Sequence, residues 1–298
     1  MEYRLLGNSS LSVSRIGFGC MSLAGSDSAN SDLLHAAVDK GINFFDTADL
    51  YGNGSNEATL GAALKANRKN IILATKVGNQ LKADGSGTVW NPSKKHILAA
   101  VNDSLKRLQT DYIDLYQLHG GTIADNIDET IDAFNLLQQQ GKIRFYGISS
   151  IRPNVIRAYA SRSSIASVMM QYSLLDRRPE ESCFDILAGK NIGILARGGL
   201  AGGLLVDKPA KQYLTYSEPL VKKAAASIAG LSNSKRLATQ TSLQFVLQQP
   251  AITAAIVGIR TMEQLEAAVK TEDTPPLHPD EYAHLQRAIA KNYYVEHR

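Results

Sequence analysis

The sequence predicts a (β/α)8 barrel, a closed ring of eight parallel strands surrounded by helices. Eight short, apolar, β-rich runs recur along the 298 residues, and they are almost continuously hydrophobic, as strands buried on both faces are. Helical patterns separate these runs, and strands that alternate with helices form parallel sheets. The length also suits a barrel. We therefore expect residues 1–298 to form a single barrel domain.

The predicted elements begin with a hairpin. The stretch Gly7-Asn8-Ser9-Ser10 lies between short apolar segments, which indicates a β-hairpin ahead of the barrel. The expected barrel strands are Ile16–Gly19, Ile42–Asp46, Ile71–Lys76, Tyr112–Leu118, Ile143–Ser149, Ser167–Gln171, Ile192–Ala196 and Ile252–Val257. A helix and a short tail are expected at the C-terminus.

The sequence shows most clearly where two helices begin or end and where one long insertion lies. Asn91-Pro92-Ser93 opens a helical pattern that continues to Arg107. A second pattern covers residues 127–140 and ends at Gly141, because glycine tolerates the positive φ that often follows a helix. Between Ala196 and Ile252 lies a long insertion that starts with RGGLAGGLLVDKPAKQYLTYS, and its glycine content is typical of a lid over a binding site.

The main alternative fold is a doubly wound sheet that binds a dinucleotide through a GxGxxG motif. That motif follows an early strand and opens a helix. The candidate here, Gly17-Phe18-Gly19, lacks the third glycine and has no helix pattern directly after it. The barrel is therefore the preferred prediction.

The composition excludes several classes of protein. Hydrophobic residues make up 44% and charged residues 20%, which is typical of a soluble globular protein. No apolar run approaches the ~18 residues that span a bilayer, and the start of the chain lacks a signal-peptide pattern. The net charge is +4, and its basic pairs are scattered, which argues against a nucleic-acid surface. With only Cys20 and Cys183, we expect a cytoplasmic protein without disulfides.

Three of the expected strands end in ionisable side chains. The second ends in Asp46 and the third in Lys76, His119 closes the fourth, and Tyr51 lies in the loop after Asp46. In such barrels the functional groups lie at the carboxyl ends of the strands, and neighbouring strands are about 4.8 Å apart. We therefore expect these four side chains to converge, with Lys76 as the counter-ion of Asp46.

This group of residues suits acid–base chemistry at a carbonyl group. A nearby ammonium favours a phenolate and burial opposes it, and we expect Lys76 to lower the pKa of Tyr51 below its usual value near ~10. Tyr51 could then donate a proton to a carbonyl oxygen that becomes an alkoxide, while His119 orients that carbonyl. Each residue alone has a structural explanation, but their occurrence at successive strand ends favours a catalytic site.

The sequence strongly resembles the aldo-keto reductases, and the similarity extends from GNSSLSVSRIGFGCM to IVGIRTMEQLE. Its most specific elements are DTADLYG, TK and LH, in that order and spacing. Within the family the chain is similar to the branch of channel β-subunits and aryl-alcohol dehydrogenases. The resemblance implies a barrel that binds NADP(H) without a Rossmann fold. It also implies a catalytic tetrad in which Tyr51 is the general acid, Lys76 tunes it, Asp46 holds Lys76, and His119 orients the carbonyl.

The resemblance further implies direct hydride transfer from the nicotinamide to the carbonyl carbon of a small-molecule aldehyde or ketone, without a metal. Phosphates commonly bind after strands seven and eight of a barrel. Here Gly258 allows close backbone approach, Arg260 supplies a planar cation, and Thr261 can cap a helix. This arrangement favours NADPH over NADH, the alternative being an arginine on a solvated face. By the resemblance, Gln264 contacts the adenosine end.

The segment after the seventh strand resembles the loop that folds over the pyrophosphate. Glycines there free backbone N–H groups for anion contact, and the resemblance assigns Leu200, Gly202 and Lys208 to this role. Arg197 occupies the place of an aromatic residue that usually stacks on the nicotinamide. A guanidinium disfavours the cationic oxidised ring, so we expect carbonyl reduction to be the preferred direction.

The nicotinamide carboxamide is expected near the fifth and sixth strands. Ser149 matches a family serine, and the family glutamine aligns with Met169. Gln171 lies two residues further on the same strand face and can replace it. The floor of the nicotinamide site is expected at Gly19, Cys20 and Met21. For Cys20, packing is favoured over a nucleophilic role.

The substrate pocket is expected between the loops 78–91 and 120–127 and the tail around Tyr293 and Tyr294. Tyr51, His119 and Trp90 are the expected substrate contacts, and their aromatic rings suggest an apolar or aromatic carbonyl compound. A loop tryptophan can equally be a packing anchor. No helix stands out as an interface, so the oligomeric state is left open.

Two other functions compete with carbonyl reduction. One is an NADP(H)-binding redox sensor or regulatory subunit with slow turnover, which needs only the cofactor loops. The other is an aldolase or isomerase in which Lys76 forms a Schiff base. The intact tetrad and its DTADLYG context favour the reductase.

Overall fold

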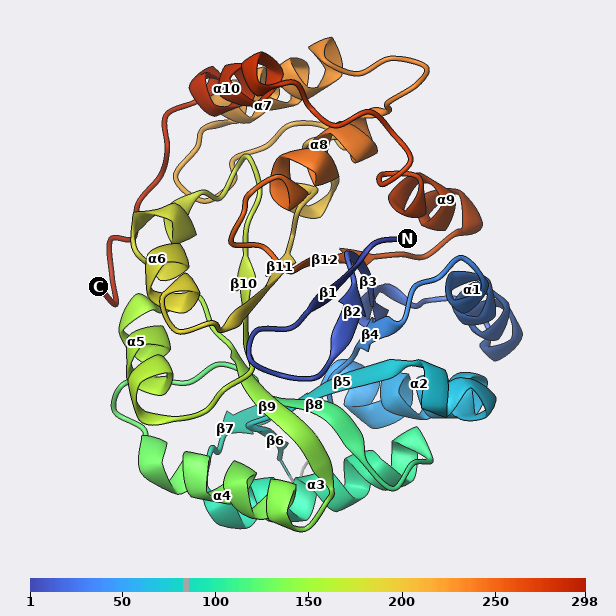
Figure 1. Ribbon diagram of the computed structural model, residues 1–298, viewed down its shortest axis with the longest axis vertical. Helices are drawn as coiled ribbons and strands as arrows, with labels where there is room; N and C mark the ends of the chain where they lie inside the picture. The colour runs from blue at the N-terminus through green and yellow to red at the C-terminus, as the bar shows by residue number, and fades with distance from the viewer. Residues whose placement is uncertain (83–85) are drawn as a thin grey trace.

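The computed structural model describes residues 1–82 and 86–298 and confirms the predicted (β/α)8 barrel (Figure 1). Eight parallel strands follow one another around the ring in chain order, and the last pairs with the first. They are β3 (Ile16–Gly19), β4 (Phe44–Asp46), β5 (Ile72–Val77), β8 (Ile113–Leu118), β9 (Ile143–Ser149), β10 (Ser167–Gln171), β11 (Gly193–Arg197) and β12 (Ala254–Gly258). Because all run parallel, their carboxyl ends open on the same side of the barrel.

Helices surround this ring, as Figure 1 shows. They are α1 (Asp27–Asp39), α2 (Ser55–Leu64), α3 (Lys94–Leu108), α4 (Ile127–Gln139), α5 (Pro153–Arg162), α6 (Cys183–Ala188), α7 (Glu218–Gly230), α8 (Ala238–Leu247), α9 (Met262–Val269) and α10 (Pro279–Ala288). Both clearly marked helices are confirmed. The side chain of Ser93 caps α3 by accepting a hydrogen bond from the His96 N–H, and Gly141 follows α4 with φ +69°.

The N-terminal hairpin closes the amino-terminal end of the barrel. Its strands β1 (Tyr3–Leu5) and β2 (Ser12–Ser14) pair antiparallel. Leu6, Leu11 and Val13 are buried against inward-facing side chains of the barrel strands. Gly7 has φ +57°, and a Cβ there would lie 2.5 Å from the Gly193 backbone nitrogen. With this end plugged, the barrel is left open at the carboxyl ends of its strands.

Several strand boundaries differ from the prediction, and the clearest case is the second barrel strand. It begins at Phe44 rather than Ile42. The Asn43 side chain instead bonds the backbone of the N-terminal hairpin, accepting from the Ser14 N–H at 2.8 Å and donating to the Ser12 carbonyl at 2.8 Å. The side chain just before β4 is therefore tied to the plug, while the Asn43 carbonyl accepts from the Ile72 N–H at the start of β5 at 2.6 Å.

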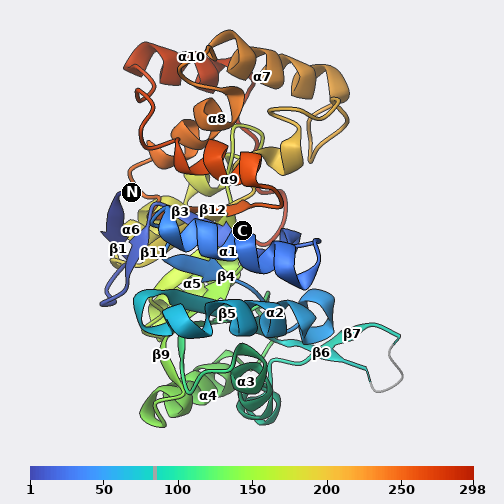
Figure 2. The ribbon, with the colours of Figure 1, turned by 90° about the vertical axis from the view of Figure 1, so that its right-hand side faces the viewer.

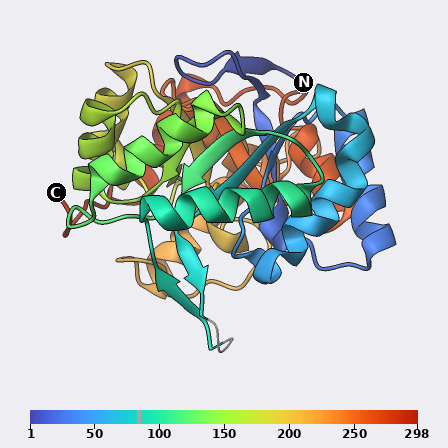
Figure 3. The ribbon, with the colours of Figure 1, turned by 90° about the horizontal axis from the view of Figure 1, so that it is seen from below.

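A second hairpin was not predicted. Strands β6 (Asn79–Leu81) and β7 (Thr88–Trp90) pair antiparallel directly after β5, and Figures 2 and 3 show them projecting from the barrel. Residues 83–85 of the predicted substrate loop 78–91 lie outside the described residues. The insertion between β11 and β12 contains α7 and α8.

Among residues 1–82 and 86–298, every helix is too short or too polar to span a lipid bilayer.

Candidate active site

The four residues predicted to converge do so at the carboxyl ends of β4, β5 and β8. Asp46 is the last residue of β4, Lys76 is followed only by Val77 in β5, and His119 comes directly after β8. Tyr51 opens the short 3-10 helix η2 (Tyr51–Gly54). All four line one cavity of about 970 Å³, which is near the upper end of the range for small-molecule sites.

Lys76 and Asp46 form a buried ion pair. The Lys76 Nζ lies 2.6 Å from Asp46 Oδ2 and also donates to the Thr47 carbonyl at 2.7 Å. Gln117 of β8 donates to the other carboxylate oxygen, Asp46 Oδ1, at 3.2 Å. Buried ions need such additional hydrogen bonds, because desolvation otherwise outweighs their attraction. Gln117 was missed in the sequence, although its position two residues before His119 was a usable signal.

The pKa of Tyr51 does not follow the predicted direction. The Lys76 Nζ lies 5.1 Å from the centre of the Tyr51 ring. Burial raises the pKa of Tyr51, and the charge of Lys76 lowers it by less, so the pKa lies above its usual value. The predicted lowering by Lys76 is therefore present, but desolvation of the phenolate is the larger effect and raises the net pKa. Tyr51 keeps its proton at neutral pH.

Lys76 itself remains a cation. Burial lowers its pKa, but the charges and hydrogen bonds of Asp46 and Tyr51 raise it by more, and the net pKa lies above the usual value. Its side chain is only 1% exposed. The ammonium group is therefore a fixed positive charge beneath the phenol ring.

His119 lies beside Tyr51 as a neutral imidazole. The two ring centres are 5.8 Å apart and the ring planes meet at 83°. Burial, followed by the positive charges of Lys76 and Arg197, lowers the pKa of His119 to about 3. Its Nδ1 is buried and has no hydrogen-bond partner among the described residues. A neutral imidazole can hydrogen-bond an oxygen in the cavity without adding a charge.

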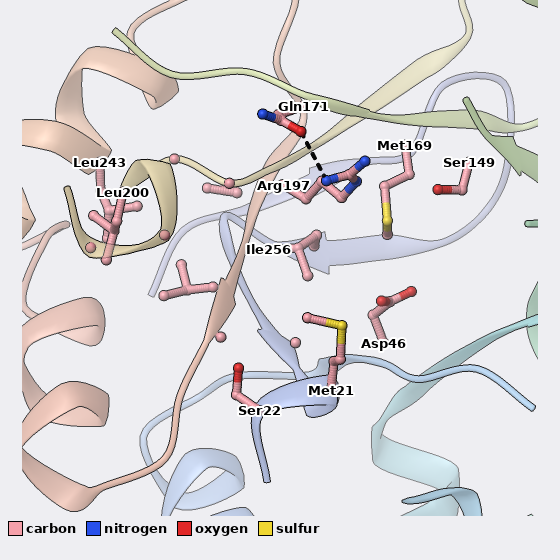
Figure 4. Close-up of a pocket in the computed structure, with 18 of the residues that line it drawn as sticks. Met21, Ser22, Asp46, Ser149, Met169, Gln171, Arg197, Leu200, Leu243 and Ile256 are labelled. Atoms are coloured by element: carbon pink, nitrogen blue, oxygen red, sulfur yellow. Dashed lines mark hydrogen bonds between the residues drawn. The ribbon is translucent and has the colours of Figure 1, made fainter. Parts of the chain in front are cut away.

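The same cavity extends from these four residues to the segments after β11 and β12. Predicted cofactor residues that line it are Gly19, Met21, Ser149, Gln171, Arg197, Leu200, Gly202, Lys208, Gly258, Arg260 and Gln264. Figure 4 shows Arg197 and Met169 in the part of the cavity that also holds Met21 and Asp46. Residues far apart in the sequence thus share one continuous site.

Two predicted contacts lie elsewhere. Cys20 is fully buried outside the cavity lining, with Sγ 3.7 Å from the Phe18 carbonyl oxygen, so its role is packing. Trp90 also does not line the cavity. Its ring covers Gly78, where a Cβ would come within 2.6 Å of it, and its indole N–H donates to Asp125 at 3.1 Å. Trp90 is a packing anchor because its ring is held against the backbone at Gly78 and its indole is bonded to Asp125.

The C-terminal tail does not wall the cavity as predicted. It runs beside α5 and α6, as Figure 1 shows. The Tyr294 N–H donates to Glu181 at 3.1 Å, and the His297 carbonyl accepts from the Asn154 N–H at 2.8 Å. These bonds direct Tyr293 and Tyr294 away from the site.

One hydrogen-bonded chain crosses the cavity and was not predicted. Arg197 Nη1 donates to Gln171 Oε1 at 3.2 Å (Figure 4), and Gln171 Nε2 donates to the Tyr213 hydroxyl at 2.5 Å. Tyr213 belongs to the insertion after β11, so the chain links that insertion to the barrel. The oxygen and the nitrogen of the Gln171 amide are both hydrogen-bonded within this chain. Met169 also lines the cavity, but its side chain has no polar group that could take part.

The distal part of the cavity has features that fit the phosphates of a dinucleotide. Thr261 caps α9 by accepting from the Gln264 N–H at 3.3 Å, and Gln264 Oε1 accepts from the Arg260 N–H at 2.9 Å. This places a helix N-terminus beside an exposed arginine, an arrangement that attracts anions. At Gly258 a Cβ would lie 2.5 Å from Ser22 Oγ, so a side chain there would require the Ser22 hydroxyl to rotate away.

The segment after β11 contributes further residues to the distal part of the cavity. Gly202 and Gly203 have φ +67° and +98°, and a Cβ on Gly203 would lie 3.0 Å from Asp207 Oδ1. Lys208 follows directly and lines the cavity. The Gly203 N–H donates to the Leu200 carbonyl at 2.9 Å, so these glycines serve mainly to form a tight turn beside the cavity. The residues present, which include the exposed cations Lys208 and Arg260, therefore fit a nicotinamide dinucleotide.

Comparison with known proteins agrees with this geometry. The sequence model of the Aldo/keto reductase family matches residues 15–290. A Bacillus subtilis protein named uncharacterized oxidoreductase YqkF is 46% identical over 307 residues, and the match covers 100% of both chains. The solved aldo-keto reductase AKR11C1 from Bacillus halodurans, in its holo form, superposes with a TM-score of 0.94 at 46% identity, covering 100% of this chain and 99% of that one. The chain belongs to the aldo/keto reductase family.

Proposed function

We propose that the protein reduces an aldehyde or ketone to the alcohol with NADPH. Its family consists of oxidoreductases that reduce carbonyl groups with nicotinamide cofactors. The observation that carries the proposal is the buried 2.6 Å pair of Lys76 and Asp46 beneath Tyr51, in a cavity that continues to Arg260. This arrangement combines a proton donor with a cofactor-sized site.

In this proposal Tyr51 is the general acid. It donates its proton to the carbonyl oxygen, and the positive charge of Lys76 stabilises the tyrosinate that forms. Asp46 keeps Lys76 in place, and the neutral His119 donates a hydrogen bond to the same oxygen. A nicotinamide cofactor, held by the residues that line the cavity, would supply the hydride for the carbonyl carbon. A proton from solvent then restores Tyr51.

The raised pKa of Tyr51 is compatible with this role. It ensures that the phenol carries its proton when substrate binds, and the substrate oxygen becomes a strong base only as hydride arrives. The stabilisation by Lys76 is then needed most in the transition state, which is where catalysis requires it.

NADPH is the proposed cofactor because two exposed cations, Lys208 and Arg260, line the distal part of the cavity. Arginine binds a phosphomonoester through a planar set of donors, and the 2′-phosphate distinguishes NADPH from NADH. The free, buried thiols Cys20 and Cys183 fit a reducing compartment, so we place the reaction in the cytoplasm. We also propose that residues 1–298 act as one domain.

The structure does not favour a Schiff-base mechanism. A lysine that forms a Schiff base must be deprotonated, which a lowered pKa promotes. The pKa of Lys76 is raised, and its ammonium group donates to Asp46 and to the Thr47 carbonyl. Lys76 is therefore held as a cation.

The proposal is tested by following NADPH absorbance with a panel of aldehydes, ketones and quinones. Tyr51→Phe should reduce kcat by about 10²–10⁴-fold, the usual contribution of a general acid, while NADPH binding, measured by fluorescence titration, stays unchanged. Trp90→Phe serves as a control outside the cavity. Wild-type turnover by Tyr51→Phe would show that another group is the acid.

A further inference from the structure

A second group of buried polar side chains lies behind the loop that carries Tyr51. We call it the Asp49 cluster, and its members are Asp49, Glu57, Thr75, Arg107 and Tyr116. Asp49 lies between β4 and η2, Glu57 is in α2, Arg107 is in α3, and Thr75 and Tyr116 are register partners on β5 and β8. These residues do not line the cavity. They contact the back of the wall on which the proposed catalytic residues stand.

Glu57 and Arg107 form a hydrogen-bonded ion pair within this cluster. Glu57 is 0% exposed. Its Oε2 accepts from Arg107 Nε at 2.7 Å and Nη2 at 2.6 Å, and its Oε1 accepts from Thr75 Oγ1 at 2.6 Å. Arg107 also donates to Ser104. The guanidinium charge is thus already paired with a carboxylate.

Asp49 is left without a cation of its own. Its Oδ1 is buried and has no hydrogen-bond partner among the described residues, and the same is true of the Tyr116 hydroxyl. The charged groups that influence Asp49 are Glu57, Arg107 and Lys76, and Lys76 is paired with Asp46. Burial first, and then the charge of Glu57, raises the pKa of Asp49 to about 7, against smaller opposing effects of a hydrogen bond from the Leu50 backbone and of the charges of Arg107 and Lys76.

The cluster is joined to the Tyr51 loop at two points. The Asp49 N–H donates to the Lys76 carbonyl at 3.3 Å, and two residues later the Tyr51 N–H donates to the Ala48 carbonyl at 3.1 Å. At the other end of the loop, Gly54 has φ +90° and packs on Arg107, where a Cβ would lie 2.7 Å from Cδ. The loop that carries Tyr51 is therefore fixed by these backbone hydrogen bonds at one end and by the packing of Gly54 on Arg107 at the other.

We propose that Asp49, as the neutral carboxylic acid, positions Tyr51 for proton transfer, and that Glu57 and Arg107 keep Asp49 neutral by pairing with each other. When Asp49 ionises, Glu57 repels it, and the nearby cations are already paired. Its carboxylate then moves toward solvent and displaces the backbone two residues before Tyr51. Asp49 does not line the cavity, so it is a positioning residue. The inference rests on the proposed role of Tyr51.

The test is the pH dependence of kcat/KM for the carbonyl substrate at saturating NADPH. If ionised Asp49 is inactive, a midpoint near 7 predicts a decrease of up to about tenfold between pH 6 and pH 8 in the wild type. Asp49→Asn keeps a neutral group of the same shape, so it should retain wild-type activity at pH 6 and change less than about twofold over this range. Glu57→Gln removes the repulsion and frees Arg107, which should move the midpoint to lower pH.

Stability measurements give an independent readout. Asp49 binds its proton more tightly in the folded protein than in the unfolded chain. Its contribution to stability is therefore present at pH 4 and is lost as the pH rises through 7. Urea unfolding should show that the wild type loses more stability than Asp49→Asn between pH 5 and pH 8.

The outcomes separate the inference from the proposed function. An alkaline decrease that is unchanged in Asp49→Asn, or an equal loss of activity at every pH, would overturn the positioning role. If Asp49→Asn does not fold, the direction of the midpoint shift in Glu57→Gln decides instead. Full activity of Tyr51→Phe would refute the proposed function itself, whereas an inactive Tyr51→Phe with an unaltered Asp49→Asn profile refutes only the role of Asp49.

Discussion

The two ends of the cavity are built in different ways. At one end, Asp46, Lys76 and Gln117 are buried and come from three adjacent barrel strands, where they bond to one another. At the other end, Lys208 and Arg260 are exposed on segments after β11 and β12. Proton transfer needs groups fixed in a low-dielectric setting, whereas phosphate binding needs donors that a ligand can reach. The first end is therefore preorganised, and the second is open.

The largest expected difference between the two ends comes from the substitution Lys76→Met. It leaves the Asp46 carboxylate buried without its cation, which should destabilise the fold by about 3–5 kcal/mol and abolish carbonyl reduction. Urea unfolding measures the first effect and NADPH consumption the second. Arg260→Ala is the matched change at the open end, and its stability should stay within about 0.5 kcal/mol of wild type. Equal destabilisation by both variants would remove the distinction between the two ends.

Arg260→Ala should instead affect the choice of cofactor. A hydrogen bond to a charged group contributes about 1.5–3 kcal/mol, so the dissociation constant for NADPH should rise about 10–100-fold, while that for NADH changes little. Fluorescence titrations with both cofactors measure this difference, and Arg260→Lys should retain part of the preference. A similar loss for NADPH and NADH would place the 2′-phosphate elsewhere.

The smallest expected effect concerns Arg197, which lies between the two ends. Its positive charge should disfavour the oxidised cofactor, whose ring is cationic, relative to the reduced one. Arg197→Trp should shift the ratio of the two dissociation constants by about fivefold toward the oxidised form, a change of about 1 kcal/mol. Calorimetric titration of both forms gives the ratio. No change would mean that the guanidinium lies away from the ring.

Much of the fold and of the proposed site was readable from local patterns. The limits of β3, β9 and β10 agree with the predicted strands, α3 begins directly after the predicted opening at Ser93, and Thr261 caps α9 as expected. The residues that end strands converge because parallel strands bring their carboxyl ends together. Cys20 and Trp90 lie outside the cavity lining expected for them, whereas the packing roles given as their alternatives agree with the structure.

What the sequence by itself determined is the alternation of strands and helices and the identity of the polar residues at the strand ends. Hydrophobic periodicity and capping residues act over a few positions, so they can be read directly. Only the tertiary structure decided the raised pKa of Tyr51, the partner Gln117 and the uncompensated carboxyl of Asp49. Each depends on burial and on charges contributed by distant segments, and desolvation is a property of the packed molecule rather than of any stretch of the chain.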